Sequence, residues 1–143
     1  MVVENFIFSR VYLGVIGQVP LFAGLGEDEI AELASLFKER RFPAGETITK
    51  EGAGAAAFFV IDSGEVTVTL HGKHLATLTR GDYFGELALI DEGARSATVT
   101  ASSNLVCHGL TYWEFRPLVQ ANATIAWNLL QTFAKRLRAA QDD

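Results

Sequence analysis

The spacing of apolar residues changes twice along the chain and divides it into three parts. Residues 26–40 begin with acidic side chains and then carry apolar ones three and four positions apart. The apolar positions are Ile30, Leu33, Ala34 and Phe37. Residues at this spacing share one helical face, and acids suit the positive N-terminal end of a helix. The pattern predicts an amphipathic helix in an N-terminal helical region, 19–40, preceded by an apolar arm, 1–18.

The middle part, residues 41–110, consists of short runs rich in β-branched and aromatic residues. The runs are ETITK, AFFVI, EVTVTL, KHLATLT, RSATVTA and NLVCHGL, and glycines mark most of the turns between them. Brief strands at regular spacing are typical of an antiparallel sandwich or barrel. We therefore predict a mainly β fold with flanking helices, an antiparallel β-roll of the jelly-roll or double-stranded β-helix type.

Helical patterns return over residues 111–140. The sequence TYWE at 111–114 has the spacing of a capping box, and Pro117 is expected to end or bend the short helix that follows. Asn122 suits the N-cap of a longer closing helix with an apolar stripe. We expect this helix to pack on the β-roll or on a second copy of itself. The residues that approximate a coiled-coil seam are Leu130, Phe133 and Leu137.

Composition narrows the classes of function. The 143 residues fit a single domain, 1–143, and the net charge of −5 disfavours nucleic acid as a partner. Glycines and Pro20 interrupt the apolar stretch at 11–25, which is also shorter than a membrane helix, so we expect neither a membrane span nor a secretory signal. The single cysteine, Cys107, is expected to pack as an apolar group and fits a reducing, cytoplasmic setting.

The candidate chemistry lies at 84–99, FGELALIDEGARSATV. Gly85 permits close backbone approach, and the following residues are long enough for one helical turn whose N–H groups face an anion. The fork of Arg95 matches two phosphate oxygens, and Glu86 suits a sugar hydroxyl. An ordinary surface ion pair between Arg95 and a neighbouring acid, such as Asp91 or Glu92, explains the same residues. The residues alone favour the surface ion pair.

The same stretch resembles the phosphate-binding cassette of the cyclic nucleotide-binding domain family. Both halves match its pattern, Phe84-Gly85-Glu86-Leu87-Ala88-Leu89 and Arg95-Ser96-Ala97-Thr98-Val99. A second motif of the family matches at 48–64, with departures at Thr49 and in the alanine-rich turn that follows Gly52. The resemblance covers roughly residues 19 to 140.

The resemblance implies a binding site. Arg95 would hold the cyclic phosphate and Glu86 the ribose 2′-hydroxyl, while Ser96 is compatible with both cAMP and cGMP. Leu137 or Arg138 would cap the base. The nucleotide-binding residues implied by the resemblance are Gly85, Glu86, Leu87, Ala88, Arg95, Ser96, Ala97, Val68 and Leu78.

The resemblance also implies a function. The expected protein is a non-enzymatic regulatory module, like the sensor domain of catabolite activator proteins without their DNA-binding domain. It would bind cAMP first and cGMP second, need no cofactor or metal, and pass the signal through its closing helix to a second copy or to an effector protein. Two alternatives stay open: a cupin-like metalloenzyme, and a family member that has lost nucleotide binding and acts as an interaction domain. His71 and His74 lack the spacing of a cupin metal motif, and His108 is expected to be packed in a strand.

Overall fold

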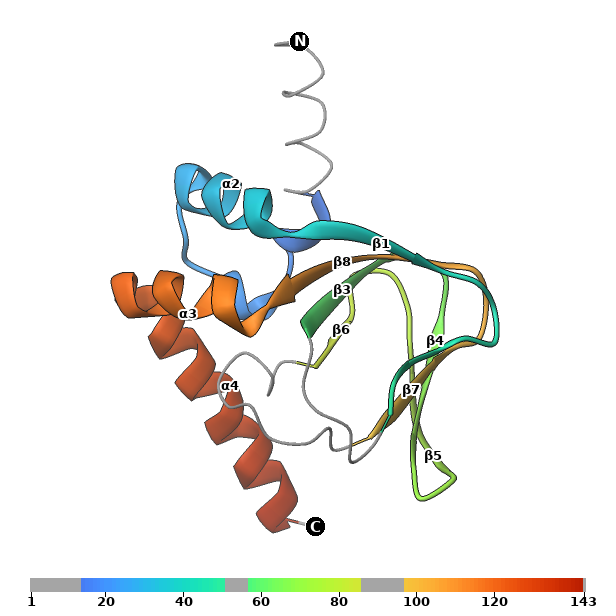
Figure 1. The fold of residues 1–143 in the computed structure, drawn as a ribbon. Coiled ribbons are helices and arrows are strands. Elements are labelled where there is room, and N and C mark those ends of the chain that lie inside the picture. Colours follow the sequence, from blue (N-terminus) through green and yellow to red (C-terminus); the bar gives the residue numbers. More distant parts are fainter. Residues whose placement is uncertain (1–13, 51–56, 86–96, 143) are drawn as a thin grey trace, which may run out of the picture.

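The computed structural model describes residues 14–50, 57–85 and 97–142, and its strands form two four-stranded antiparallel sheets (Figure 1). This arrangement confirms the predicted β-roll with flanking helices. The first sheet has the order β1 (Lys38–Phe42), β8 (Leu105–Thr111), β3 (Ala57–Ser63) and β6 (Tyr83–Phe84). The second has the order β2 (Thr47–Thr49), β7 (Thr98–Ala101), β4 (Val66–Leu70) and β5 (Lys73–Leu78).

The helices gather at one side of the first sheet (Figure 1). They are η1 (Pro20–Phe22), α2 (Glu27–Leu36), α3 (Tyr112–Ala121) and α4 (Ala123–Asp142), and residues 14–16 are also helical. Apolar side chains from these helices and from the outer face of β3 and β8 form one core cluster. None of the described helices is both long and apolar enough to cross a membrane.

Strand β3 is buried on both faces and separates two cores. Phe58 and Val60 face the helical core, whereas Phe59 and Ile61 face a second core inside the roll. Alternate side chains of a strand point to opposite faces, so a strand covered on both sides reads as a continuous apolar run. This burial explains the sequence AFFVI.

The first predicted helix is too long. Helix α2 ends at Leu36, four residues before the predicted end at 40, and β1 begins at Lys38. Phe37 is buried between them and packs edge-to-face against Phe22 and Phe58. The charged stretch after Phe37 looks like a helix terminus, but its backbone pairs with β8 in register from Lys38 opposite Gly109. A long-range pairing of this kind overrides the local helical pattern.

Helix α3 begins as predicted and ends later than predicted. The Thr111 hydroxyl accepts from the Glu114 backbone N–H at 3.3 Å, and the Glu114 carboxylate accepts from the Thr111 backbone N–H at 3.2 Å, which confirms the capping box. Pro117 does not end the helix, which continues to Ala121. A proline removes one N–H donor. Here Pro117 is exposed, so water can reach this side of α3.

Asn122 is the N-cap of α4, as predicted. Its side-chain oxygen accepts from the backbone N–H groups of Thr124 and Ile125 at 3.0 and 3.3 Å. Its amide donates to Glu29 of α2, so the same residue joins the closing helix to the N-terminal helices. Trp113 is 71% and Trp127 is 61% exposed, so neither side chain belongs to the core.

Two hairpin glycines allow the cost of backbone strain to be distinguished from the cost of a steric clash. Gly64 and Gly72 both have positive φ, +94° and +77°. A Cβ at Gly64 would lie 2.3 Å from the Asn104 carbonyl oxygen, whereas one at Gly72 would meet nothing within 4 Å. We expect Gly72→Ala to lower the free energy of unfolding by about 1–2 kcal/mol and Gly64→Ala by on the order of 4 kcal/mol. Urea denaturation measures both, and equal losses would contradict the described packing of Gly64 against the start of β8.

Candidate functional site

The strand that leads into the candidate cassette packs against both cores. Strand β6 contains only Tyr83 and Phe84, and they contact opposite cores. The Tyr83 ring lies 5.6 Å from that of Phe58, and the Phe84 ring stacks at 5.2 Å on that of Phe59. Gly85 follows at φ +82°, a backbone conformation that side chains with a Cβ rarely adopt. The cassette therefore begins at an anchored strand followed by a turn that favours glycine.

The other end of the cassette belongs to the second sheet. Ala97 is half-buried and comes directly before β7, where Val99 is buried and pairs with Val68 of β4. The chain thus leaves the first sheet at Gly85 and rejoins the structure in the second sheet at Ala97. Five of the predicted site residues lie between these two points and outside the described residues. They are Glu86, Leu87, Ala88, Arg95 and Ser96.

Val68 and Leu78 lie on the inner wall of the roll. Both are half-buried and pack against the core inside the roll. Val68 stands opposite Val99, two residues from Ala97, and Leu78 stands opposite Val66 in the neighbouring strand pair. The structure therefore brings these two side chains to the same sheet as the returning end of the cassette, on a face that is apolar and only partly covered.

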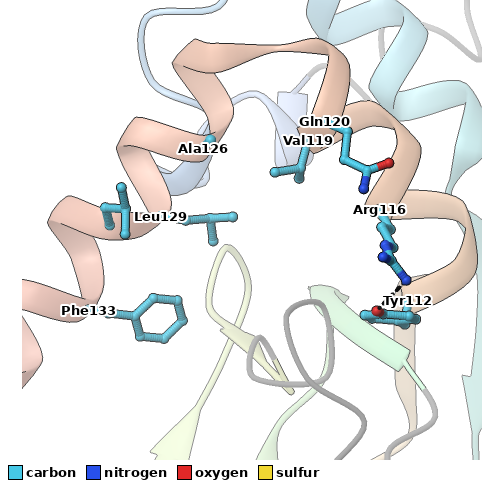
Figure 2. Close-up of a pocket in the computed structure, with 8 residues that line it drawn as sticks. Tyr112, Arg116, Val119, Gln120, Ala126, Leu129 and Phe133 are labelled. Atoms are coloured by element: carbon cyan, nitrogen blue, oxygen red, sulfur yellow. Dashed lines mark hydrogen bonds between the residues drawn. The ribbon is translucent and has the colours of Figure 1, made fainter.

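A groove between α3 and α4 was not predicted (Figure 2). Its volume is about 410 Å³, and its walls are mainly apolar. At one end the Arg116 guanidinium lies 5.9 Å from the centre of the Tyr112 ring and donates to its hydroxyl at 3.2 Å. The sequence signal was the spacing of Tyr112, Arg116 and Gln120, which places them on one helical face. The other lining residues are Val119, Ala126, Leu129, Leu130 and Phe133.

The two candidate base caps project from the last part of α4. Leu137 is 62% exposed and Arg138 is also exposed. Their proposed contact with a base remains a prediction. Figure 1 shows α4 running away from α3 along one side of the roll.

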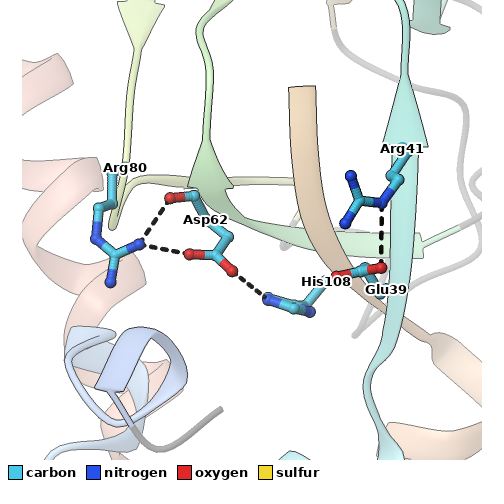
Figure 3. A network of polar contacts seen from close by, with 5 residues as sticks. All are labelled: Glu39, Arg41, Asp62, Arg80 and His108. Carbon is cyan, nitrogen blue, oxygen red and sulfur yellow. Dashed lines mark hydrogen bonds and ion pairs between the residues drawn. The ribbon is translucent and has the colours of Figure 1, made fainter. Parts of the chain in front are cut away.

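A polar network ties the loop before β6 to the first sheet (Figure 3). Arg80 donates to the carbonyl oxygen of Asp62 at 2.8 Å and pairs with its carboxylate Oδ1 at 2.5 Å. The second carboxylate oxygen lies 3.1 Å from Nε2 of His108, which is 2% exposed in β8. The predicted packing of His108 in a strand is confirmed. A separate exposed pair joins Arg41 to Glu39 on β1.

The cysteine and the other two histidines lie in environments that indicate structural rather than chemical roles. Burial raises the pKa of the Cys107 thiol to about 12, only partly opposed by the charge of Arg40, so the thiol stays protonated and packs as an apolar group as predicted. His71 and Gly72 form the turn between β4 and β5, and His74 hydrogen-bonds to Thr77 at 3.0 Å. Among the described residues, no three His, Cys, Asp or Glu side chains are grouped so as to hold a metal ion.

Known proteins match the chain in sequence and in fold. The family model for the cyclic nucleotide-binding domain matches residues 39–122. The cAMP-dependent protein kinase regulatory subunit of Emericella nidulans is 40% identical over 98 residues, 67% of this chain, and a cGMP-dependent protein kinase of Toxoplasma gondii is 40% identical over 89 residues, 62% of this chain. The crystal structure of Thermus thermophilus catabolite activator protein superposes with a TM-score of 0.78 at 35% identity, covering 85% of this chain.

These relatives are longer than the matched region. The chain spans 24% of the Emericella regulatory subunit, 9% of the Toxoplasma kinase and 60% of the Thermus structure. The match therefore concerns part of each relative.

Proposed function

The chain belongs to the cyclic nucleotide-binding domain family, and we propose that it binds a 3′,5′-cyclic nucleotide inside the β-roll, cAMP first and cGMP second. One observation carries the proposal. The two-part cassette sequence stands where the chain crosses from the first sheet to the second, between Gly85 at φ +82° and Ala97. Both ends are anchored in buried strands, which is the support that a preformed anion site requires.

Within the proposed site, Arg95 neutralises the cyclic phosphate and Glu86 accepts from the ribose 2′-hydroxyl. A guanidinium presents parallel donors that match two phosphate oxygens, whereas an ionised carboxylate only accepts. Backbone N–H groups near Leu87, Ala88 and Ala97 complete the cradle. With a net charge of −5 for the whole chain, attraction of the anion has to come from this local cation.

The sugar and base contact the inner wall of the second sheet. Val68 and Leu78 offer half-buried apolar surface there, one and two strands away from the returning end of the cassette. Ser96 provides a hydroxyl that suits either purine, and Leu137 or Arg138 covers the base when α4 closes. The matched relatives include a cAMP-dependent protein kinase regulatory subunit and a cGMP-dependent protein kinase, which supports either nucleotide as the ligand.

The proposed role is regulatory rather than catalytic, and we place it in the cytoplasm. Bound nucleotide shifts α4 only if it binds the closed arrangement of α4 more tightly than the open one. Helix α4 is the natural carrier, because Asn122 joins its start to α2 while its last two turns are exposed. Family membership favours this role over a cupin-like metalloenzyme.

Arg95→Leu tests the phosphate contact. Removing one partner of a desolvated charge pair loses about 2–5 kcal/mol, so we expect affinity for cAMP and cGMP to fall by roughly 30-fold to a few thousand-fold. Isothermal titration calorimetry measures both ligands on the wild type and the variant. Arg41→Leu is the matched control, because Arg41 is an exposed cation paired with Glu39 on β1. Wild-type protein that binds neither nucleotide at millimolar concentration, or Arg95→Leu that binds as tightly as the control, would sink the proposal.

We propose further that α4 contacts a second copy of the chain. The sequence pattern placed Leu130, Phe133 and Leu137 in a seam, but Phe133 is half-buried and packs against the helical core instead. The exposed side of the helix carries Trp127, Leu130, Ala134 and Leu137, at spacings of three and four. Each of the three large members is at least 61% exposed. Apolar residues at this spacing form the seam of paired helices. The opposite side of α4 is already occupied, because Ile125 and Leu129 are buried in the helical core.

The seam predicts a homodimer that a charge disrupts. Sedimentation velocity at tens of micromolar is expected to show a dimer for the wild type and a monomer for Leu130→Glu and Leu137→Glu, because a charge buried between two helices is not compensated. Ala139→Glu is the control, as this exposed residue lies on the far side of α4 from the seam. A monomeric wild type would refute the homodimer, and the seam would then be assigned to contact with an effector protein.

A further inference from the structure

Among the described residues, Arg136 joins the outer part of α4 to the roll. From Ala134 to Gln141 every residue of α4 is exposed. Within this stretch the Arg136 guanidinium lies 5.9 Å from the centre of the Tyr83 ring and donates to the Tyr83 hydroxyl at 3.4 Å. It also lies 5.5 Å from the ring of Phe133, one turn earlier in α4. The cation is thus close to two aromatic rings, one from the helix and one from the sheet.

Tyr83 connects this contact to the cassette. It is half-buried in β6, pairs with Val60 of β3, and packs on Phe58, which is fully buried. Only Phe84 separates it from Gly85, where the cassette begins. A displacement of α4 that pulls on Tyr83 therefore acts on a strand of two residues next to the phosphate site.

We propose that Arg136 is a positioning residue for the nucleotide site: its contact with Tyr83 links the position of α4 to the entry of the cassette. The inference rests on the proposed binding function and adds a specific connection to it. A cation over an aromatic face contributes about 0.5–1 kcal/mol at an exposed site and more when desolvated. That range is small against the stability of a domain, but it can bias a helix whose contacts, among the described residues, are mainly with η1 and α3.

The alternative is that Arg136 only complements the negative end of α4, as a cation near a helix C-terminus does. The two roles differ in what they require of the partner. Complementing the helix end needs a charge on α4 and no particular residue on β6. Positioning needs both Arg136 and Tyr83, and its loss changes how long a ligand stays bound.

The sign of the effect follows from linkage. If bound nucleotide and the Arg136–Tyr83 contact favour the same placement of α4, each strengthens the other by the same factor. Loss of the contact then speeds dissociation of the ligand, while association, which is governed by access to the roll, is unchanged.

Four variants test this inference: Arg136→Gln, Arg136→Lys, Tyr83→Phe and the double variant Arg136→Gln/Tyr83→Phe. Lys135→Gln removes the same charge from the neighbouring exposed residue and serves as control. Stopped-flow kinetics with a fluorescent cAMP analogue should show dissociation about 2- to 10-fold faster for Arg136→Gln, with an unchanged association rate. Arg136→Lys should recover part of the effect, and the double variant should be no faster than Arg136→Gln alone.

A second readout needs no ligand. Hydrogen–deuterium exchange of the amides at 134–141 should be faster in Arg136→Gln and Tyr83→Phe than in Lys135→Gln. If the wild type binds no nucleotide, the proposed function fails and the link to the site fails with it, while faster exchange would still locate the contact. If the wild type binds but Arg136→Gln matches Lys135→Gln in dissociation rate, or the two single effects add in the double variant, the positioning role is wrong.

Discussion

The burial of β3 on both faces is the constraint on which the rest of the structure depends. Phe58 and Val60 contact the helices and Phe59 and Ile61 contact the interior of the roll, so one strand holds the two cores together. Apolar burial of this kind is the main favourable term in folding, and it leaves the strand no freedom to slip by one residue, since a slip would exchange the two faces. The strands that pair with β3 are therefore positioned by it.

Strand β6 depends on β3 for its position most directly. The two residues of β6 are too few to form a stable strand alone, but each ring packs on a phenylalanine of β3 from its own side. Gly85 is therefore placed by the two cores and not by the cassette itself. The same strand carries the Tyr83 contact to Arg136, so the proposed phosphate site and the outer part of α4 share a single anchored element. In the proposed mechanism, ligand occupancy and the position of α4 are linked through this strand.

The sequence predicted the features that local patterns determine. The roll, the capping box at Thr111 and the N-cap at Asn122 follow from alternation and from capping chemistry, and the structure confirms them. The strand at 38–42 was missed because its charged side chains resemble a helix end, and only its pairing with β8 reveals it. Two other features were missed for a similar reason. The groove depends on the angle between α3 and α4, and the Arg136–Tyr83 contact joins residues that are distant in sequence. The roles of Arg95 and Glu86 come from the family pattern and stay predictions, since those residues lie outside the described ranges.

The central claim is that a cyclic nucleotide lies inside the roll, against the wall formed by Val68 and Leu78 and beside the crossing at Gly85. Intermolecular nuclear Overhauser effects between bound cAMP and the methyl-labelled protein test it most directly. The account predicts contacts from the ribose and base protons to the methyl groups of Val68 and Leu78. Contacts that instead involve only methyl groups of the α3–α4 groove, such as those of Val119 and Leu129, would contradict it.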